Sequence, residues 1–312
     1  MYEFMLPKQW HISPYFYNQM NPYMDYRMDQ TARAAAFLDK GGVGKTTTIA
    51  HLGVALANED LDVCLIDLAG KQGDLTKHFG LWSEVRDEDP WPNITTVFQD
   101  QWASIVDQLP NAVDQLIMST DEGPDLIPAD EGLDGLESLL GSIDDVADRY
   151  SRLDDFLSEY LDDRYDVILL DLPGSTSNVA YNGLWAARRI ITPVRAGPFE
   201  AEQTSQLQTD LSEIRSGQGV DVSLTMLIIN EYDSRKTVDR ELFERLSQEY
   251  PDELAPEQVP GSQDVTNAQE QGQTIFALES PSKTAKQARE AYQTNARELL
   301  SRIETIETGV SQ

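Results

Sequence analysis

The chain has 312 residues, of which 54 are Asp or Glu and 24 are Lys or Arg, so its formal net charge is -30. Apolar strand patterns and amphipathic helix patterns run through most of it, which excludes a disordered acidic chain. No run approaches about 18 apolar residues and the N-terminus has no compact apolar signal core. We therefore expect a soluble, cytoplasmic protein.

The sign of the charge predicts adaptation to concentrated salt. At about 1 M salt, screening shortens to roughly 3 Å, so carboxylate repulsion that destabilises a fold in dilute buffer becomes tolerable. The composition thus indicates a halophilic protein. The single cysteine, Cys64, lies in the apolar run LDVCLID and is predicted to be a buried core residue in a reducing compartment.

Residues 1–30 differ from the rest of the chain. They hold five of the seven methionines and five of the twelve tyrosines, without clear periodicity. One interpretation is an overextended start, because Met28 opens a stretch that runs directly into a strand; the other is an aromatic docking arm. We favour the first, since termini are usually untied. Residues 31–312 are predicted to form one domain.

From Ala34 onward, apolar strand candidates alternate with helical patterns, which predicts an α/β fold with a doubly wound, mostly parallel sheet flanked by helices. An acidic loop with two prolines is expected at 86–93, and one or two amphipathic helices between Leu133 and Tyr160. The predicted strands are 34–39, 62–67, 125–129, 165–172, 189–194 and 222–230.

The stretch FLDKGGVGKTT places a strand before a glycine-rich turn and a helical run after it, which is the context that a phosphate-binding loop requires. Glycines let the backbone N–H groups converge on phosphate oxygens, and the helix N-terminus adds a favourable dipole. We expect Lys45 to reach the β- and γ-phosphates, Thr46 to bind Mg²⁺ and Thr47 to lie near the α-phosphate. The loop residues predicted to bind nucleotide are Gly41, Gly42, Val43, Gly44, Lys45, Thr46 and Thr47.

The motif KGGVGKTT, with Asp39 where the usual loop has a glycine, resembles the deviant Walker A loop of the ParA/MinD (Soj-like) family of ATPases. Combined with the acidity, it suggests a ParA-like protein of a haloarchaeon. The resemblance implies that Lys40 reaches across a dimer interface to the nucleotide of the partner. Alternatively, Lys40 is a solvated loop cation. The chain has only eight lysines, and four of them, Lys40, Lys45, Lys71 and Lys77, lie in this region.

Two further stretches carry the resemblance. YDVILLDLPG ends a strand on Asp171, the family position that holds Mg²⁺ through water. Asn230, which closes LTMLIIN, resembles the family position that contacts adenine, although strand-ending asparagines are often turn formers. With looser matches such as YNGLWAAR, the resemblance covers roughly Ala34 to Ile306.

The segment after the second strand departs from the family pattern. It reads DLAGKQGDLT, in which Asp67 matches the first family aspartate, a candidate for catalysis and for the metal. The second family aspartate, which orients the attacking water, is replaced by Ala69 or Gly70. Asp67, Asp74 or Gln72 are candidates to take over that task, and the additional Lys71 either touches phosphate or is solvated. The catalytic set implied by the resemblance is Lys40, Lys45 and Asp67.

The resemblance implies an ATPase with ATP and Mg²⁺ as cofactors that forms an ATP-dependent homodimer and partitions DNA or positions a cargo, stimulated by a ParB-like partner. The alternative is an ATP-locked dimer that hydrolyses little and serves as a platform. Helix 281–307 has a balance of 5 − 4 = +1 and is a candidate for nonspecific DNA contact, although Gly261 replaces a family arginine. A MinD-like membrane role is disfavoured, because the tail ETGVSQ lacks lysines and bulky apolar residues.

Overall fold

The computed structural model describes residues 30–39, 41–70, 73–88, 90–197 and 200–310. A seven-stranded sheet in the order β3-β4-β2-β5-β1-β6-β7 runs through the molecule, and its pairs are parallel except β3 with β4. The strands are β1 (Ala32–Ala36), β2 (Val63–Asp67), β3 (Met118–Ser119), β4 (Asp125–Ile127), β5 (Val167–Asp171), β6 (Arg189–Val194) and β7 (Ser223–Ile229).

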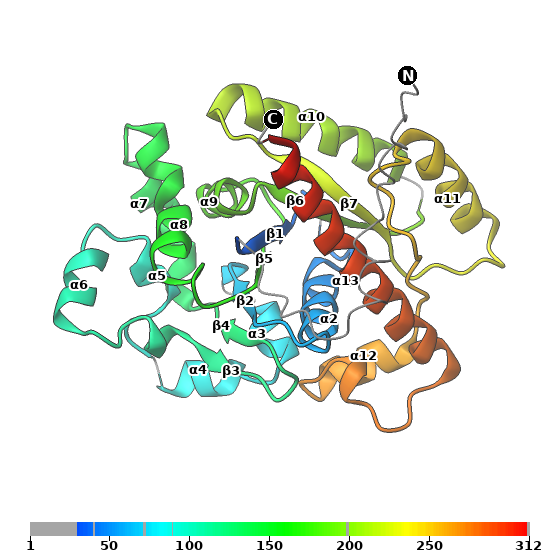
Figure 1. The fold of residues 1–312 in the computed structure, drawn as a ribbon, viewed down its shortest axis with the longest axis horizontal. Helices are drawn as coiled ribbons and strands as arrows, with labels where there is room; N and C mark the ends of the chain where they lie inside the picture. The colour runs from blue at the N-terminus through cyan, green and yellow to red at the C-terminus, as the bar shows by residue number, and fades with distance from the viewer. Residues whose placement is uncertain (1–29, 40, 71–72, 89, 198–199, 311–312) are drawn as a thin grey trace, which may run out of the picture.

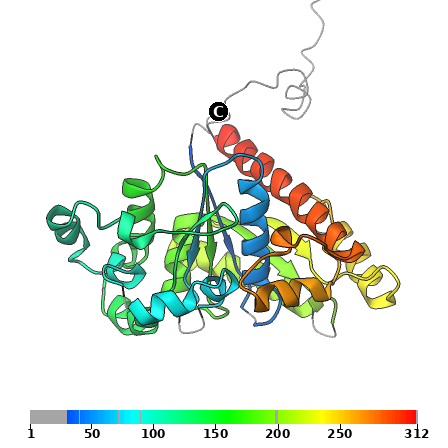
Figure 2. The ribbon, with the colours of Figure 1, turned by 90° about the horizontal axis from the view of Figure 1, so that it is seen from below.

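Helices cover both faces of this sheet (Figure 1; Figure 2). α2 and α13 lie side by side on one face, and α8 and α9 pack on the other. The helices are α2 (Lys45–Ala57), α3 (Asp74–His78), α4 (Trp82–Glu88), α5 (Ile94–Val97), α6 (Trp102–Gln108), α7 (Leu136–Gly141), α8 (Val146–Tyr160), α9 (Asn178–Ala187), α10 (Glu200–Gln218), α11 (Thr237–Glu249), α12 (Gln263–Glu270) and α13 (Lys283–Val310), with the short 3₁₀ turns η2 (Asp114–Leu116), η3 (Glu131–Gly135) and η4 (Ile275–Ala277).

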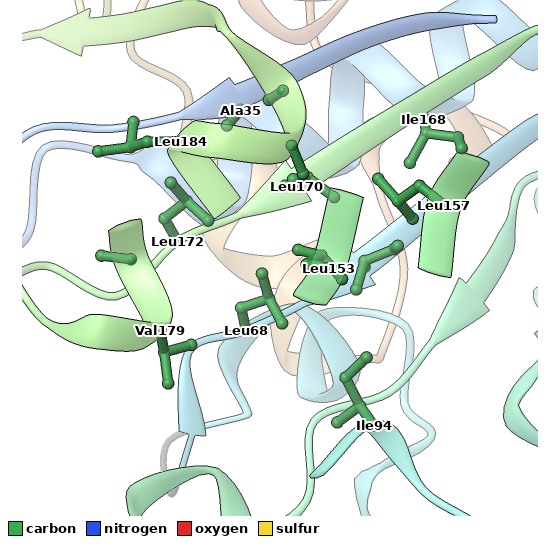
Figure 3. Packing of buried hydrophobic residues seen from close by; sticks show 14 of the residues in the cluster. Ala35, Leu68, Ile94, Leu153, Leu157, Ile168, Leu170, Leu172, Val179 and Leu184 are labelled. Carbon is green, nitrogen blue, oxygen red and sulfur yellow. The ribbon is translucent and has the colours of Figure 1, made fainter. Parts of the chain in front are cut away.

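The central strands are apolar on both sides because both faces are covered. In β5, Ile168 and Leu170 point toward α8, where they meet Leu153 and Leu157 (Figure 3). Val167 and Leu169 belong to the core on the α2 and α13 face. Burying a Leu or Ile side chain contributes roughly 1.5–3 kcal/mol, so these alternating contacts hold the layers together.

The register of the strands places the acidic residues at the ends of β2 and β5 next to each other. Asp67 of β2 and Ala36 of β1 are both the Cα partners of Asp171 in β5. Because these strands are parallel, their carboxyl ends meet at one edge of the sheet, next to the loop that leads from β1 into α2.

The six predicted strands are all present, and the doubly wound, mostly parallel sheet is confirmed. Most strands are shorter than predicted, and the first spans 32–36 rather than 34–39. The interpretation of 86–93 as a loop is wrong at its start, because α4 continues to Glu88. The helical pattern between Leu133 and Tyr160 divides into η3, α7 and α8.

Cys64, the second residue of β2, is buried as predicted. The last helix runs over 283–310 instead of 281–307. Apart from Gln30, the N-terminal segment 1–30 lies outside the described residues. Among the helices that the structure describes, none is long and apolar enough to cross a membrane.

Candidate functional site

The loop between β1 and α2 has the backbone of a phosphate-binding turn. Gly42 and Gly44 have φ values of 78° and 95°, a region that residues with a Cβ rarely adopt. A Cβ on Gly44 would also lie 2.7 Å from Nδ2 of Asn230. No side chain caps the N-terminus of α2, so its first N–H groups are available to an anion.

Lys45, the first residue of α2, lies beneath this loop. Its side chain is buried, and Nζ donates a hydrogen bond to the carbonyl oxygen of Leu38 at 3.1 Å. Burial lowers the pKa of Lys45, while the negative charges of Asp171 and Asp39 act in the opposite direction. The ammonium group is therefore held inside the β1–α2 loop, close to carboxylates.

Thr46 and Asp171 form the second part of the site. Oγ1 of Thr46 donates to Oδ2 of Asp171 at 2.7 Å, whereas Oδ1 of Asp171 is buried with no hydrogen-bond partner in the described structure. Burial first, and then the neighbouring charge of Asp67, raise the pKa of Asp171 to about 8. A buried carboxylate with one open oxygen beside a threonine hydroxyl fits the all-oxygen ligand preference of Mg²⁺.

Asp67, at the end of β2, is fully buried and both of its oxygens accept hydrogen bonds. Oδ1 accepts from the backbone N–H of Ala69 at 3.0 Å, and Oδ2 accepts from the N–H and hydroxyl of Thr76 at 2.8 and 2.7 Å. Oγ1 of Thr76 in turn accepts from the N–H of Ala129 at 3.1 Å. Burial raises the pKa of Asp67 against these bonds. Asp67 thus anchors the segment that follows β2.

Asn230, just after β7, holds the phosphate-binding loop between β1 and α2 through hydrogen bonds. Its Nδ2 donates to the carbonyl of Val43 at 3.3 Å and to Oγ1 of Thr48 at 3.1 Å, while Oδ1 has no hydrogen-bond partner in the described structure. The residue is only 6% exposed. In this structure its amide nitrogen is engaged with the phosphate loop, and its open oxygen is the group left for a ligand.

The structure brings together most of the residues singled out from the sequence, at the carboxyl edge of the sheet: Gly41, Gly42, Val43, Gly44, Lys45, Thr46, Thr47, Asp67, Asp171 and Asn230. Lys40, Lys71 and Gln72 lie outside the described residues. In the described part of the chain, no group of three or more His, Cys, Asp or Glu side chains forms a metal cage. A metal here would therefore take its remaining ligands from water or substrate.

Sequence reasoning missed the residues that support the site. Thr76 fixes Asp67, and Thr48 accepts the amide of Asn230. His51 donates from Nδ1 to the carbonyl of Thr47 at 2.7 Å and accepts from the N–H of Ile275 at 3.2 Å, so it ties the first turns of α2 to η4. Their hydroxyl and imidazole groups have no distinguishing pattern in the sequence.

The cations of α13 are less available than the sequence suggests. Arg289 donates to the carbonyls of Ile275 and Leu278, both at 2.6 Å, and Arg302 to those of Thr225, Glu253 and Leu254. Arg297 pairs with Glu59. Lys283 and Lys286, near the start of the helix, are exposed. Three of the five cations thus hold the helix against the body of the protein.

The chain matches the model of the family AAA_31, described as an AAA domain, over residues 33–224. It is 28% identical over 264 residues to the chromosome partitioning protein ParA of Caulobacter vibrioides, covering 84% of this chain and 91% of the relative. It is also 28% identical over 272 residues to the chromosome-partitioning ATPase Soj of Thermus thermophilus, covering 87% and 96%. These organisms give no support to a haloarchaeal source.

Solved structures share the fold. A structure described as cobyrinic acid a,c-diamide synthase from Mycobacterium smegmatis, with bound ADP and magnesium, has a TM-score of 0.65 and 27% identity, covering 86% of this chain and 94% of that one. Apo McdA from Cyanthece has a TM-score of 0.67 at 20% identity, covering 86% of this chain and 99% of that one. The second likeness concerns the fold alone.

Proposed function

The chain belongs to the AAA_31 family and is a ParA/Soj-like P-loop protein, and from that premise we propose that it is a cytoplasmic Mg²⁺-dependent ATPase that dimerises on ATP. Its task is to partition DNA or to position a cargo. The names of the relatives, a chromosome partitioning protein and a chromosome-partitioning ATPase, support this class of task.

The observation that carries the proposal is that Lys45, Thr46 and Asp171 lie together where the glycine loop meets α2. The buried ammonium group, the hydroxyl and the unpartnered Oδ1 of Asp171 lie at the end of a glycine loop and at the start of α2. This combination of positive charge, N–H donors and a metal-binding carboxylate suits a nucleoside triphosphate with Mg²⁺.

Each group has a defined task in this mechanism. The N–H groups of Gly41 to Thr46 bind phosphate oxygens, and Lys45 leaves the carbonyl of Leu38 to contact the β- and γ-phosphates. Thr46 and Asp171 would hold the metal. When bound, Mg²⁺ neutralises charge that develops on the phosphates. Asp67 keeps the loop after β2 in place, and Asn230 holds the phosphate loop through Val43 and Thr48. Its contact with adenine rests on the family resemblance.

Dimerisation belongs to the same proposal. Lys40 contacts the γ-phosphate bound by the second copy, a charge-assisted bond that exists only when ATP bridges both chains. ATP therefore stabilises the dimer and hydrolysis releases it. Lys40 lies outside the described residues, so this role rests on the loop sequence and the family.

A second candidate function is a dimer that binds ATP and hydrolyses it little. The observation that favours it is the segment after β2, where Ala69 and Gly70 offer no carboxylate and Asp67 already uses both oxygens. Turnover separates the two functions, because a platform keeps ATP-dependent dimerisation and lacks hydrolysis.

Partners follow from the surface charges. A nonspecific DNA contact would rest on the exposed Lys283 and Lys286 of α13, since the arginines of that helix bind carbonyls and carboxylates of the protein. Binding of this kind weakens with salt at a slope of about −0.9 per phosphate neutralised. A ParB-like protein would stimulate hydrolysis, and a membrane role stays disfavoured. With a charge of -30, we infer that the fold is most stable in concentrated KCl.

The test is steady-state Mg-ATP turnover, measured in about 0.2 M and about 2 M KCl, conditions that differ about threefold in screening length, with and without duplex DNA. Lys45→Ala serves as the blank, and ATP-dependent dimerisation is followed by light scattering. Turnover above the blank that rises with DNA supports the cycling ATPase. An ATP-dependent dimer without turnover supports the platform, and loss of both ATP binding and dimerisation contradicts both functions. Unfolding curves in the same buffers test the salt requirement.

A further inference from the structure

Two side chains hold the phosphate-binding loop between β1 and α2 by its carbonyl groups. Nη1 of Arg195 donates to the carbonyl oxygen of Gly42 at 3.3 Å, and Nδ2 of Asn230 donates to that of Val43, also at 3.3 Å. Arg195 directly follows β6, so its contact with the loop joins residues that are 153 positions apart in the chain.

These contacts set the direction of two successive peptide groups. A trans peptide directs its C=O and its N–H to opposite sides, and neither of the two is cis. The N–H of Val43 therefore points away from Arg195, and the N–H of Gly44 points away from Asn230. Among the described residues, neither N–H has a hydrogen-bond acceptor. Both are left for a phosphate oxygen.

The first of these peptides has no support from packing. A Cβ on Gly41 or Gly42 would meet no atom of the described residues within 4 Å. Glycine adopts positive and negative φ about equally well, so a peptide beside Gly42 can flip at little cost. A flip would turn the carbonyl, instead of the N–H of Val43, toward the phosphate. A charge-assisted hydrogen bond from Arg195 to that carbonyl opposes the flip.

The guanidinium of Arg195 is itself held in place. Its Nη2 donates to Oε2 of Glu231, and the two side chains are 45% and 54% exposed. An ion pair this exposed contributes little to the stability of a fold. Its effect is therefore on the direction of the arginine, which bridges Gly42 and Glu231 through two nitrogens of one planar group.

The backbone of Glu231 adopts a conformation that residues with a Cβ rarely use. Its φ is 55°, in the left-handed region. Hydrogen bonds on both sides keep it there: the N–H of Asn230 donates to the carbonyl of Val194 at 2.7 Å, and the N–H of Tyr232 to that of Val259 at 2.9 Å. A conformation of this kind persists only where its surroundings fix it, and it gives the carboxylate a defined starting point.

From this geometry we propose that Arg195 is a positioning residue of the phosphate-binding loop. Held by Glu231, it keeps the peptide between Gly42 and Val43 with its N–H directed at the nucleotide phosphates. The inference rests on the proposed nucleotide binding and adds a residue that prepares the loop before ATP arrives. Arg195 acts through the loop, because a loop that is already ordered binds its ligand more tightly than one that orders on binding.

The test is calorimetry of Mg-ATP binding to the full chain and four variants. We expect Arg195→Met to weaken ATP binding about 10-fold, and Glu231→Gln, which keeps the shape and removes the charge, about threefold. The double variant should be no weaker than Arg195→Met, because both residues act through one contact. Arg235→Met is the matched control, since this arginine is 88% exposed and pairs with Asp233; it should match wild type.

The sign of the Glu231→Gln effect distinguishes positioning from simple attraction. If Arg195 only attracted phosphate as a cation, removing the negative charge beside it would tighten ATP binding, and that result overturns the positioning role. An additive double variant overturns it as well. Unfolding curves of the variants should coincide with that of wild type, because the ion pair is exposed.

Glu231→Gly covers the case in which Glu231→Gln fails to fold, because glycine accepts a φ of 55° without strain and also lacks the carboxylate. It should weaken ATP binding by the same factor of about three. Wild-type affinity in Arg195→Met overturns the inference and leaves the proposed ATPase function intact. A wild type that does not bind Mg-ATP overturns both.

Discussion

Charged clusters lie at both ends of the parallel strands, here called the amino edge and the carboxyl edge of the sheet. The two clusters differ in how their charged groups are paired. At the amino edge, the guanidinium of Arg33 donates to Asp154 and Asp162, and also to Ser158 and the carbonyl of Ala186. These groups line a cavity of about 730 Å³. At the carboxyl edge, Oδ1 of Asp171 is buried with no partner in the described structure.

The difference separates scaffold from site. Each nitrogen of Arg33 has an acceptor, so its guanidinium is fully paired and joins β1 to α8 and the end of α9. A buried polar atom without a partner is unfavourable by about 1–3 kcal/mol, and completion by a ligand is one reason for a fold to retain it. We therefore assign the site to the carboxyl edge because the unpartnered oxygen of Asp171 lies there beside Lys45 and Thr46, and not because of cavity size.

The largest expected effect comes from Asp171→Asn, which keeps the shape of the side chain and removes the charge. We expect the Mg²⁺-dependent affinity for ATP to fall about 10- to 100-fold, measured by calorimetry with and without Mg²⁺. In wild type the Mg²⁺ dependence should weaken as the pH falls below about 8, because protonation of Asp171 removes the metal ligand. An unchanged Mg²⁺ dependence in the variant contradicts the metal assignment.

At the amino edge we expect a substitution to change the free energy of unfolding and to leave ATP affinity unchanged. Arg33→Met removes the cation that Asp154 and Asp162 share and leaves Asp154 with Arg188 alone, and the Arg33 side chain is only 12% exposed. We expect the free energy of unfolding to fall by about 3 kcal/mol, with no change in ATP affinity. Arg86→Met is the matched control, since its pair with Asp87 is exposed and contributes about 0–1 kcal/mol. Loss of ATP binding in Arg33→Met would break the comparison between the edges.

A smaller effect tests whether every open polar group at the carboxyl edge serves a ligand. His78 of α3 is buried, and neither ring nitrogen has a hydrogen-bond partner in the described structure. Since no solvent reaches it, His78→Leu should raise the free energy of unfolding by about 1 kcal/mol. His51→Leu, which removes bonds to Thr47 and Ile275, should lower it. Denaturant curves of the two variants decide this, and a destabilised His78→Leu would show that the imidazole is needed.

The smallest effect is a difference in pH dependence. Burial lowers the pKa of His78 to about 3, so the folded state binds fewer protons than the unfolded state below the ordinary value of 6.5. The contribution of the neutral His78 to the free energy of unfolding is fully present above pH 6.5. It is lost as the pH falls toward 3, because the unfolded state gains the proton more readily. The stability advantage of His78→Leu should therefore grow between pH 7 and 5. Asp67 and Asp171 act in the opposite direction, but they are present in both proteins and cancel. Parallel pH profiles would contradict the neutral imidazole.

The strands and the phosphate loop could be predicted because their signals are local. Apolar runs such as 167–171 and the glycine pattern around Lys45 specify backbone conformation directly. The strand β3 gave no signal, because it consists of Met118 and Ser119 and pairs only at the edge. The family resemblance assigned Asp67 and Asp171 to one site, and in the structure both lie at the ends of neighbouring parallel strands.

What the sequence left open depends on partners distant in the chain. Arg302 looks like a free cation until α13 packs beside β7, where the carbonyls of Thr225, Glu253 and Leu254 accept its hydrogen bonds. In the same way, the two hydrogen bonds from Thr76 show that Asp67 is an anchor, which no spacing rule reveals. Charge can be counted in a sequence, but its availability is decided by packing.

The ring of Tyr292 in α13 stacks on His51 of α2 at a centroid distance of 4.8 Å, and both are buried. The helix that begins with Lys45 is therefore covered by a segment that is synthesised after all seven strands of the sheet. A ribosome has to translate the whole sheet before that cover exists, and a product truncated ahead of Tyr292 carries the complete glycine loop over an exposed helix. During synthesis, each molecule thus contains the nucleotide motif before its nucleotide pocket is complete.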